Sequence, residues 1–176
     1  KTSSTPIAMA QMMQRLISFL ELKNVLELGT NLGLTTAYLA AAKPSSRVIS
    51  LEGDPTLASL AVKNLQKMGL DAEIMEGRFE DNLDLALDKM ATVDFAYIDG
   101  NHRKQPTIDY FRALLASISE KSVLAFGDIH WSLEMEEAWT AIKQNKTVTF
   151  TIDLFDIGLV FFRKDRAEVE HFTIRL

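Results

Sequence analysis

A chain of 176 residues, of which 47% are hydrophobic and 24% charged, is long enough for one globular domain with a sizeable core. Its net charge of −5 and its scattered lysines and arginines weigh against a nucleic acid or an anionic membrane as partner, because both require a concentrated basic face. The absence of cysteine excludes disulfides, thiolate metal sites and a cysteine nucleophile.

Strand-like and helix-like segments alternate along the chain, which is typical of a parallel sheet covered by helices on both faces. A helix is expected to begin at Pro6, capped by Thr5. The predicted strands are residues 25–28, 47–51, 72–76, 93–98 and 123–126. The helices predicted after them are residues 35–42, 55–68, 80–90, 106–117 and 133–143.

The C-terminal part of the sequence changes character. Residues 147–154 and 159–163 are rich in β-forming residues, and the four residues between them are too few for a crossover helix. These two segments are therefore expected to pair as an antiparallel hairpin. Residues 171–175 are expected to add a short strand or to lie across the sheet. No repeat or linker interrupts the pattern, so a single domain over residues 1–176 is expected.

The segment after the first predicted strand contains a glycine turn. Glu27 ends an apolar run, and Gly29 and Gly33 follow it before the next predicted helix. Such glycines permit a tight turn and let the backbone approach a ligand at the carboxyl end of the strand. Asn31 stands where a dinucleotide fingerprint needs its second glycine, and Leu34 stands where a P-loop needs lysine. A carboxylate beside the turn would repel a pyrophosphate but would suit an ammonium or sulfonium group.

A second acid, Glu52, ends the second predicted strand, roughly 20 residues after the glycine turn, where such folds place an acid on ribose hydroxyls. The pattern from Glu27 through Gly29 to Gly33 resembles motif I of class I S-adenosylmethionine-dependent methyltransferases. Glu52 resembles the acid that binds ribose in that family. The chain looks most similar to small-molecule O-methyltransferases of the catechol and caffeoyl-CoA type and their bacterial relatives.

The resemblance implies an α/β, Rossmann-like, doubly wound and mostly parallel sheet of about seven strands, with a C-terminal antiparallel hairpin. It implies S-adenosylmethionine as cofactor, with the methionine part at Glu27 and the Gly29 backbone. The cofactor-binding residues that it implies are Glu27, Gly29, Thr30, Gly33, Glu52, Gly77, Arg78, Phe79 and Asp99. Many relatives have aspartate at the position of Arg78, so adenine recognition would depend on backbone N–H groups and on packing by Phe79.

Two further acids, Asp99 and Asp128, end the fourth and fifth predicted strands. Acids at the tips of adjacent parallel strands converge on one site, as a divalent metal or an acid–base pair requires. In the metal-dependent relatives both positions bind the metal, magnesium or manganese, and an asparagine follows the second. Ile129 stands there in this chain and cannot coordinate, so the sequence leaves the metal open.

The resemblance also implies catalytic roles around these acids. His102 stands where the relatives carry a lysine that acts as a base, so His102, Asp99 and Asp128 are the expected catalytic residues. His130 and Trp131 are expected to line the substrate pocket. No motif typical of base-modifying methyltransferases follows the fourth strand, so a small-molecule acceptor is expected rather than a nucleic acid.

Other properties remain expectations or open alternatives. No apolar run approaches the ~20 residues that span a bilayer, and no signal peptide is apparent, so a cytoplasmic protein without a membrane partner is expected. A homodimer is the commonest assembly for such a protein. The sequence also leaves open a non-catalytic S-adenosylmethionine-binding module or an aminopropyl transferase. It does not identify the acceptor, whose pocket comes from variable loops and from any segment before Lys1.

Overall fold

The computed structural model describes residues 5–165 and 168–175. The chain groups into two compact units, Lys1–Ala91 and Thr92–Leu176. Within the described residues, no helix has the length and apolar character that crossing a lipid bilayer requires.

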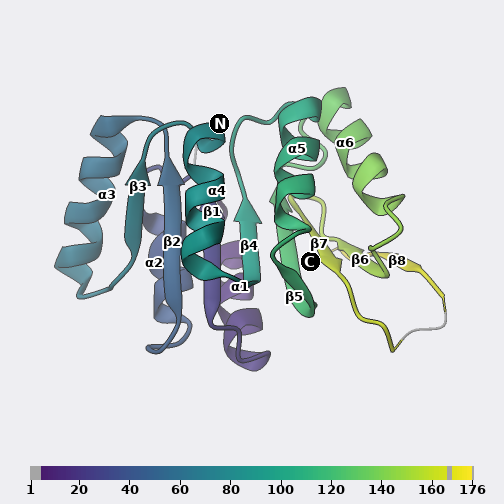
Figure 1. Cartoon of the computed structure of the whole chain (residues 1–176), viewed down its shortest axis with the longest axis horizontal. Coiled ribbons are helices and arrows are strands. Elements are labelled where there is room, and N and C mark those ends of the chain that lie inside the picture. The colour runs from purple at the N-terminus through teal and green to yellow at the C-terminus, as the bar shows by residue number, and fades with distance from the viewer. Residues whose placement is uncertain (1–4, 166–167, 176) are drawn as a thin grey trace. The chain divides into compact units, whose positions relative to one another are not determined.

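The first unit contains three parallel strands in the order β3-β2-β1. The strands are β1 (Asn24–Leu28), β2 (Arg47–Glu52) and β3 (Glu73–Glu76). Its helices are α1 (Ile7–Phe19), α2 (Leu34–Ala41), α3 (Pro55–Met68) and α4 (Phe79–Met90). In Figure 1, α2 and α4 lie on opposite sides of these strands. Because both faces are covered, every residue of β1 and β2 after the first is buried, as in central parallel strands.

The ends of α3 are set by its own flanking residues. The Asp54 side chain accepts hydrogen bonds from the N–H groups of Thr56 and Leu57, and Pro55 follows it at the first helical position. Gly69 ends the helix in the left-handed conformation, with a φ of 66°. This helix therefore begins and ends where its own residues specify.

The second unit contains five strands in the order β4-β5-β7-β6-β8. The strands are β4 (Val93–Ile98), β5 (Ile118–Gly127), β6 (Phe150–Asp153), β7 (Ile157–Phe161) and β8 (Glu170–Thr173). Its helices are α5 (Lys104–Leu114) and α6 (Leu133–Lys143). β7 runs antiparallel to both β5 and β6, between which it is inserted, while β4 pairs with β5 in parallel (Figure 1).

Most of the predicted elements are confirmed, including the C-terminal hairpin formed by β6 and β7. β8 resolves the open choice for the last segment in favour of a strand, so the described residues contain eight strands rather than about seven. Four predicted helix starts are wrong by one or two residues. α2 and α4 begin one residue early, at Leu34 and Phe79. α1 begins at Ile7 with Pro6, not Thr5, as its N-cap, and α5 begins at Lys104, two residues before Pro106. Proline fits both the N-cap and the first helical turn because its missing N–H is not needed there, so it does not mark the first residue.

Candidate active site

The glycine turn, residues 29–33, connects β1 to α2 in the first unit. Three of its residues have positive φ angles: Gly29 at 112°, Asn31 at 51° and Gly33 at 78°. A Cβ atom on Gly33 would lie 3.2 Å from the Cβ of Ala61, so the position favours glycine for its packing as well as its backbone. The Gly29 N–H donates a hydrogen bond of 3.0 Å to the carbonyl of Leu51, which holds the turn against β2.

Glu52, at the end of β2, holds the turn from the other side. Its Oε2 atom accepts a hydrogen bond of 2.7 Å from the Asn31 N–H, and its Oε1 atom accepts one of 2.9 Å from the Asp54 N–H. A carboxylate has about four acceptor positions, so two remain for further donors such as a pair of hydroxyl groups. Glu52 is therefore suited both to fix the turn and to bind a diol.

Glu27 lies beneath the turn. Its side chain is fully buried, and its Oε2 atom accepts hydrogen bonds of 2.5 Å from Thr36 Oγ1 and 2.6 Å from Ser50 Oγ. Thr30 Oγ1 lies 2.5 Å from Ser50 Oγ, which links the turn itself to this group. A buried carboxylate requires such donors, since leaving it unpaired would cost several kcal/mol. The Oε2 atom of Glu27 is thus hydrogen-bonded to hydroxyl groups of the protein.

The segment after β3 contains the residues predicted for adenine. Gly77 has a φ of 131°, and a Cβ atom on it would lie 2.7 Å from the Asn82 side-chain nitrogen. The Arg78 guanidinium donates to both carboxylate oxygens of Asp81, at 2.8 and 2.9 Å, and this hydrogen bond lowers the pKa of Asp81. Phe79 is the first residue of α4. Arg78 is therefore engaged with its own helix.

The second unit brings together the three predicted catalytic side chains, here named the acid–histidine cluster: Asp99, His102 and Asp128. His102 Nε2 lies 3.8 Å from an Asp99 carboxylate oxygen, and His102 Nδ1 lies 3.9 Å from one of Asp128. One ligand atom from each residue lies within 4.8 Å of the others. These distances allow proton exchange through a bridging atom or shared coordination of a cation.

Backbone strain is concentrated around this cluster. Asn101, His102 and Asp128 have positive φ angles of 66°, 36° and 54°. A Cβ atom on Gly127 would lie 2.5 Å from an Asp99 carboxylate oxygen, so any other residue at this position would displace the carboxylate. Such conformations persist where the surrounding structure imposes them, and they often accompany functional sites.

The segment that follows Asp128 is held by the β6–β7 turn. The Asp128 N–H donates a hydrogen bond of 2.7 Å to the Asp156 carbonyl. His130 places Nε2 2.8 Å from an Asp153 carboxylate oxygen and Nδ1 3.4 Å from one of Glu136. Its ring also stacks on Phe155, with 5.3 Å between centroids. Both ring nitrogens of His130 thus already have acidic partners.

The two neighbours of His130 in the chain have opposite environments. Trp131 is half-exposed, at 51%, whereas Ile129 is buried, at 1%. The Ile129 side chain belongs to the core of the second unit, so it neither ligates nor faces an ion.

Several residues that build these clusters were missed in the sequence: Thr36 and Ser50 beneath the glycine turn, Gly127 beside Asp99, and Asp153 beside His130. Ser50 gave a usable signal, because it is the one hydroxyl residue in the apolar run of residues 48–51. Asp153 gave none, since it pairs with a residue 23 positions away.

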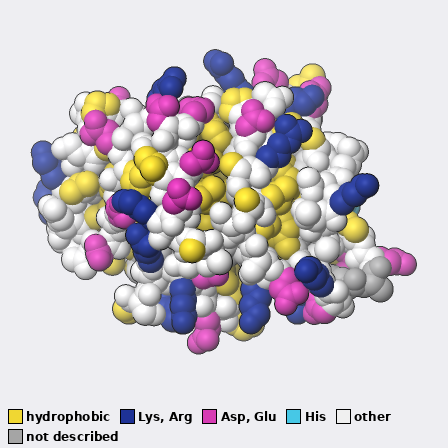
Figure 2. All heavy atoms as spheres, in the orientation of Figure 1, with side chains coloured by type: hydrophobic (Ala, Val, Ile, Leu, Met, Phe, Trp, Pro, Cys, Tyr) yellow, Lys and Arg dark blue, Asp and Glu magenta, His cyan; other side chains and the backbone are white. Residues whose placement is uncertain are grey.

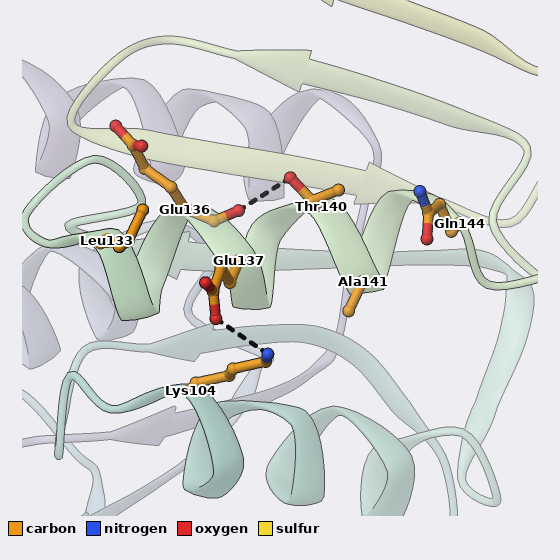
Figure 3. A pocket seen from close by; sticks show the side chains of 7 residues that line it. All are labelled: Lys104, Leu133, Glu136, Glu137, Thr140, Ala141 and Gln144. Atoms are coloured by element: carbon orange, nitrogen blue, oxygen red, sulfur yellow. Dashed lines mark hydrogen bonds and ion pairs between the residues drawn. The ribbon is translucent and has the colours of Figure 1, made fainter.

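A shallow groove of about 420 Å³ lies along α6 in the second unit, and Figure 3 shows its lining. Lys104, from the start of α5, points toward α6 and forms an ion pair of 2.9 Å with Glu137. Leu133, at the start of α6, lies at one end of the groove and Gln144 at the other. None of the predicted site residues lines this groove.

On the face that Figure 2 shows, basic and acidic side chains are interspersed rather than gathered into a patch of one sign.

A family profile described as a methyltransferase domain matches residues 26–129, which is more than half of the chain. The match includes the glycine turn with Glu52 and the acid–histidine cluster. The chain belongs to this methyltransferase family. A catechol O-methyltransferase of Niastella koreensis is 36% identical over 104 residues, which cover 57% of this chain and 46% of that protein. The O-methyltransferase imqG of Aspergillus flavus is 33% identical over 96 residues, covering 51% and 38% of the two chains. The matched parts thus span less than half of the length of these curated relatives.

The fold has close counterparts among solved structures. An O-methyltransferase from Bacillus cereus, solved in complex with S-adenosylhomocysteine (SAH), superposes with a TM-score of 0.77 at 21% identity. The match covers 92% of this chain and 84% of that one. The methyltransferase therefore has the α/β, Rossmann-like fold that the sequence predicts.

Proposed function

We propose that this methyltransferase transfers the methyl group of S-adenosylmethionine to an oxygen of a small molecule. The observation that supports this proposal most directly is that the family match contains both the glycine turn with Glu52 and the acid–histidine cluster. The match also runs across the boundary between the two units at residues 91 and 92. We therefore propose that both units work as one catalytic domain.

In the proposed reaction the first unit holds the donor, whose sulfonium supplies the activated methyl group. The turn at Gly29, Thr30 and Gly33 receives the methionine part, and Glu52 accepts hydrogen bonds from the two ribose hydroxyls through its remaining acceptor positions. Gly77 and Phe79 are proposed to contact the adenine. Arg78 is bonded to Asp81, so its proposed effect on adenine binding is indirect, through the conformation of this segment.

The second unit supplies the groups that act on the acceptor. Methyl transfer to oxygen is an in-line displacement that requires the acceptor proton to be removed. His102 is the proposed base, because its ring nitrogens lie 3.8 and 3.9 Å from carboxylate oxygens of Asp99 and Asp128, which leaves room for an acceptor hydroxyl beside them. Asp99 and Asp128 orient the ring. The half-exposed Trp131 and the ring edge of His130 are proposed to border the acceptor.

The same cluster fits a divalent cation such as magnesium or manganese. Asp99 and Asp128 would hold it through carboxylate oxygens, which are the ligands that such hard cations prefer. The buried Ile129 contributes no ligand, so water would complete the coordination. A cation bound there would lower the pKa of an acceptor hydroxyl, and His102 would receive the released proton.

The test is transfer of a labelled methyl group from S-adenosylmethionine to a panel of phenols and catechols, with and without chelator. The proposal predicts labelled ether products from at least one acceptor. Loss of product with chelator and recovery with magnesium or manganese would establish the metal-assisted form, and chelator-insensitive turnover would show that the reaction needs no bound cation. Tight binding of SAH without turnover of any acceptor would instead identify a non-catalytic binding module.

A further inference from the structure

We propose that Glu27 acts on the bound cofactor through the glycine turn above it, as a positioning residue, rather than by contacting the methionine ammonium group. The inference rests on the proposed function, because it concerns the same cofactor site. It assigns Ser50, Thr36 and Thr30 to the recognition of the cofactor, although the first two of them lie below the turn.

The first observation is the strain in the turn. Gly29, Asn31 and Gly33 all have positive φ angles, which glycine adopts readily and other residues rarely. Asn31 is not a glycine and therefore incurs a cost for this geometry. Such a turn keeps one shape only where neighbouring groups fix it from several sides. Glu52 fixes it at Asn31, which leaves its first residues to be fixed by other groups.

The second observation is the direction of the hydrogen bonds beneath the turn. Thr36 and Ser50 both donate to the same carboxylate oxygen of Glu27. A serine hydroxyl has one proton, and that of Ser50 is directed at Glu27. The bond of 2.5 Å between Thr30 and Ser50 must therefore use the proton of Thr30. The charge of Glu27 thus orients Ser50, and Ser50 in turn orients Thr30 within the turn.

The third observation is where these groups come from. Ser50 lies on β2, Thr36 on α2 and Thr30 in the turn between β1 and α2. The carboxylate of Glu27 therefore ties the turn to the neighbouring strand and to the helix that follows. Because all four side chains are buried, these bonds are not weakened by competing water.

The burial of Glu27 also argues against direct contact. Its side chain is 0% exposed, as are those of Leu26 and Leu28 on either side in β1. An ammonium group that reached the carboxylate would have to leave water and enter a core position. Glu52 differs from it in that both of its hydrogen bonds are to backbone N–H groups, one on each carboxylate oxygen.

The experiment compares the binding of SAH with that of its analogue lacking the α-amino group, by calorimetry. Two variants separate charge from hydrogen bonding. In Glu27→Gln the amide oxygen can replace the oxygen that accepts from Thr36 and Ser50, so both bonds remain and only the charge is lost. In Glu27→Ala both bonds are lost.

A positioning role predicts that Glu27→Ala weakens both ligands by the same factor, about tenfold or more. It predicts that Glu27→Gln stays within about threefold of wild type for both, since the amide oxygen still accepts from Thr36 and Ser50 and so keeps the turn in place. Weakening of SAH alone, with the deaminated analogue unaffected, would overturn the inference in favour of direct contact. Unchanged affinity for both ligands in Glu27→Ala would overturn it in favour of a purely structural role.

Ser50→Ala and Thr36→Val extend the test if Glu27→Ala does not fold. Each should weaken both ligands equally, whereas Ser122→Ala should lower stability without changing either affinity. Ser122 is the matched control, because it is equally buried and hydrogen-bonded but bonds to the carbonyl of Val93, outside the cofactor site. Wild type that binds neither ligand would refute the proposed function itself, whereas wild type that binds both but does not respond to these variants would refute only the inference.

Discussion

At the glycine turn the acidic groups are buried, and hydroxyl or backbone donors already occupy part of their acceptor capacity. Glu27 is fully buried and Glu52 is 9% exposed. In the acid–histidine cluster the side chains of Asp99, His102 and Asp128 are 22%, 32% and 39% exposed, and the atoms that face one another are 3.8–3.9 Å apart. The first region is closely hydrogen-bonded before any ligand arrives, and the second leaves room for an atom between its groups.

This difference matches the two tasks of a methyl transfer. A donor that must be held in one orientation favours a rigid, preorganised surface. Proton removal from an acceptor requires groups that reach solvent and change their protonation state. Substitutions in the two regions should therefore separate, with affinity for SAH changing in the first and turnover changing in the second.

His102→Ala should give the largest effect. Loss of a general base typically lowers the rate by about 10²–10⁴-fold, and because the cluster belongs to the second unit, affinity for SAH should stay near wild type. Turnover of an acceptor identified by labelled methyl transfer, measured beside SAH calorimetry, checks both parts. His171→Ala is the matched control, since His171 lies on β8 and bonds to Thr151. A variant that retains full turnover would remove His102 from the mechanism.

Gly127→Ala should give the next largest effect. The added Cβ would come within 2.5 Å of the Asp99 carboxylate and 3.1 Å of the Tyr97 hydroxyl, so the carboxylate must leave its present position. We expect turnover to fall by about tenfold or more, as for other displacements of order 1 Å in catalytic groups. Gly53→Ala has open space around the added atom and should be nearly neutral. Equal activity of the two variants would show that the position of Asp99 is not critical.

Glu52→Ala should act on the other region. It removes the acceptor of the Asn31 and Asp54 N–H groups and the proposed partner of the ribose. Because hydrogen bonds to charged groups contribute about 1.5–3 kcal/mol each, affinity for SAH should fall by roughly 10- to 100-fold or more. Asp88→Ala, an exposed acid on α4, should leave affinity unchanged. Unchanged affinity for SAH in Glu52→Ala would show that the methyl donor binds elsewhere.

His171→Gln should give the smallest effect, on stability rather than function. Burial, and to a lesser degree the charge of Lys143, lowers the pKa of His171 below its ordinary value of 6.5. Between 6.5 and the lower folded value the unfolded chain binds more protons, so the free energy of unfolding decreases as the pH falls through this window. The variant should lack this decrease, by less than about 1 kcal/mol after solvent screening. Urea unfolding at pH 7.5 and 5.5 measures the difference, and a larger decrease in the variant would contradict the assignment.

Local patterns in the sequence were sufficient to predict most of the fold. The alternation of apolar strands and helices, and the punctuation of α3 by Asp54 and Gly69, depend on neighbours in the chain, so the sequence shows them directly. The β6–β7 hairpin followed from the four residues between its predicted strands. Helix starts were less certain, because a proline such as Pro106 fits several positions of a first turn.

The candidate site was predictable where residue types sit at strand ends. The convergence of Asp99, His102 and Asp128 follows from parallel strands ending at one edge, and the structure brings these side chains together. The residues that hold these side chains in position could not be predicted from strand ends in the same way. The partners of Glu27 are distant in the chain and common in type, and the close approach of Gly127 to Asp99 depends on side-chain placement. Only three-dimensional packing distinguishes such residues from ordinary core and turn positions.

The most direct test of the account is calorimetry with SAH and with NAD on the unmodified chain. The glycine turn, with Asn31 in place of the second glycine of a dinucleotide fingerprint and Glu52 at the end of β2, predicts binding of SAH and none of NAD. At a hundredfold excess over its dissociation constant, SAH should also stabilise the fold by roughly 2.7 kcal/mol. Binding of NAD without binding of SAH would contradict the central claim.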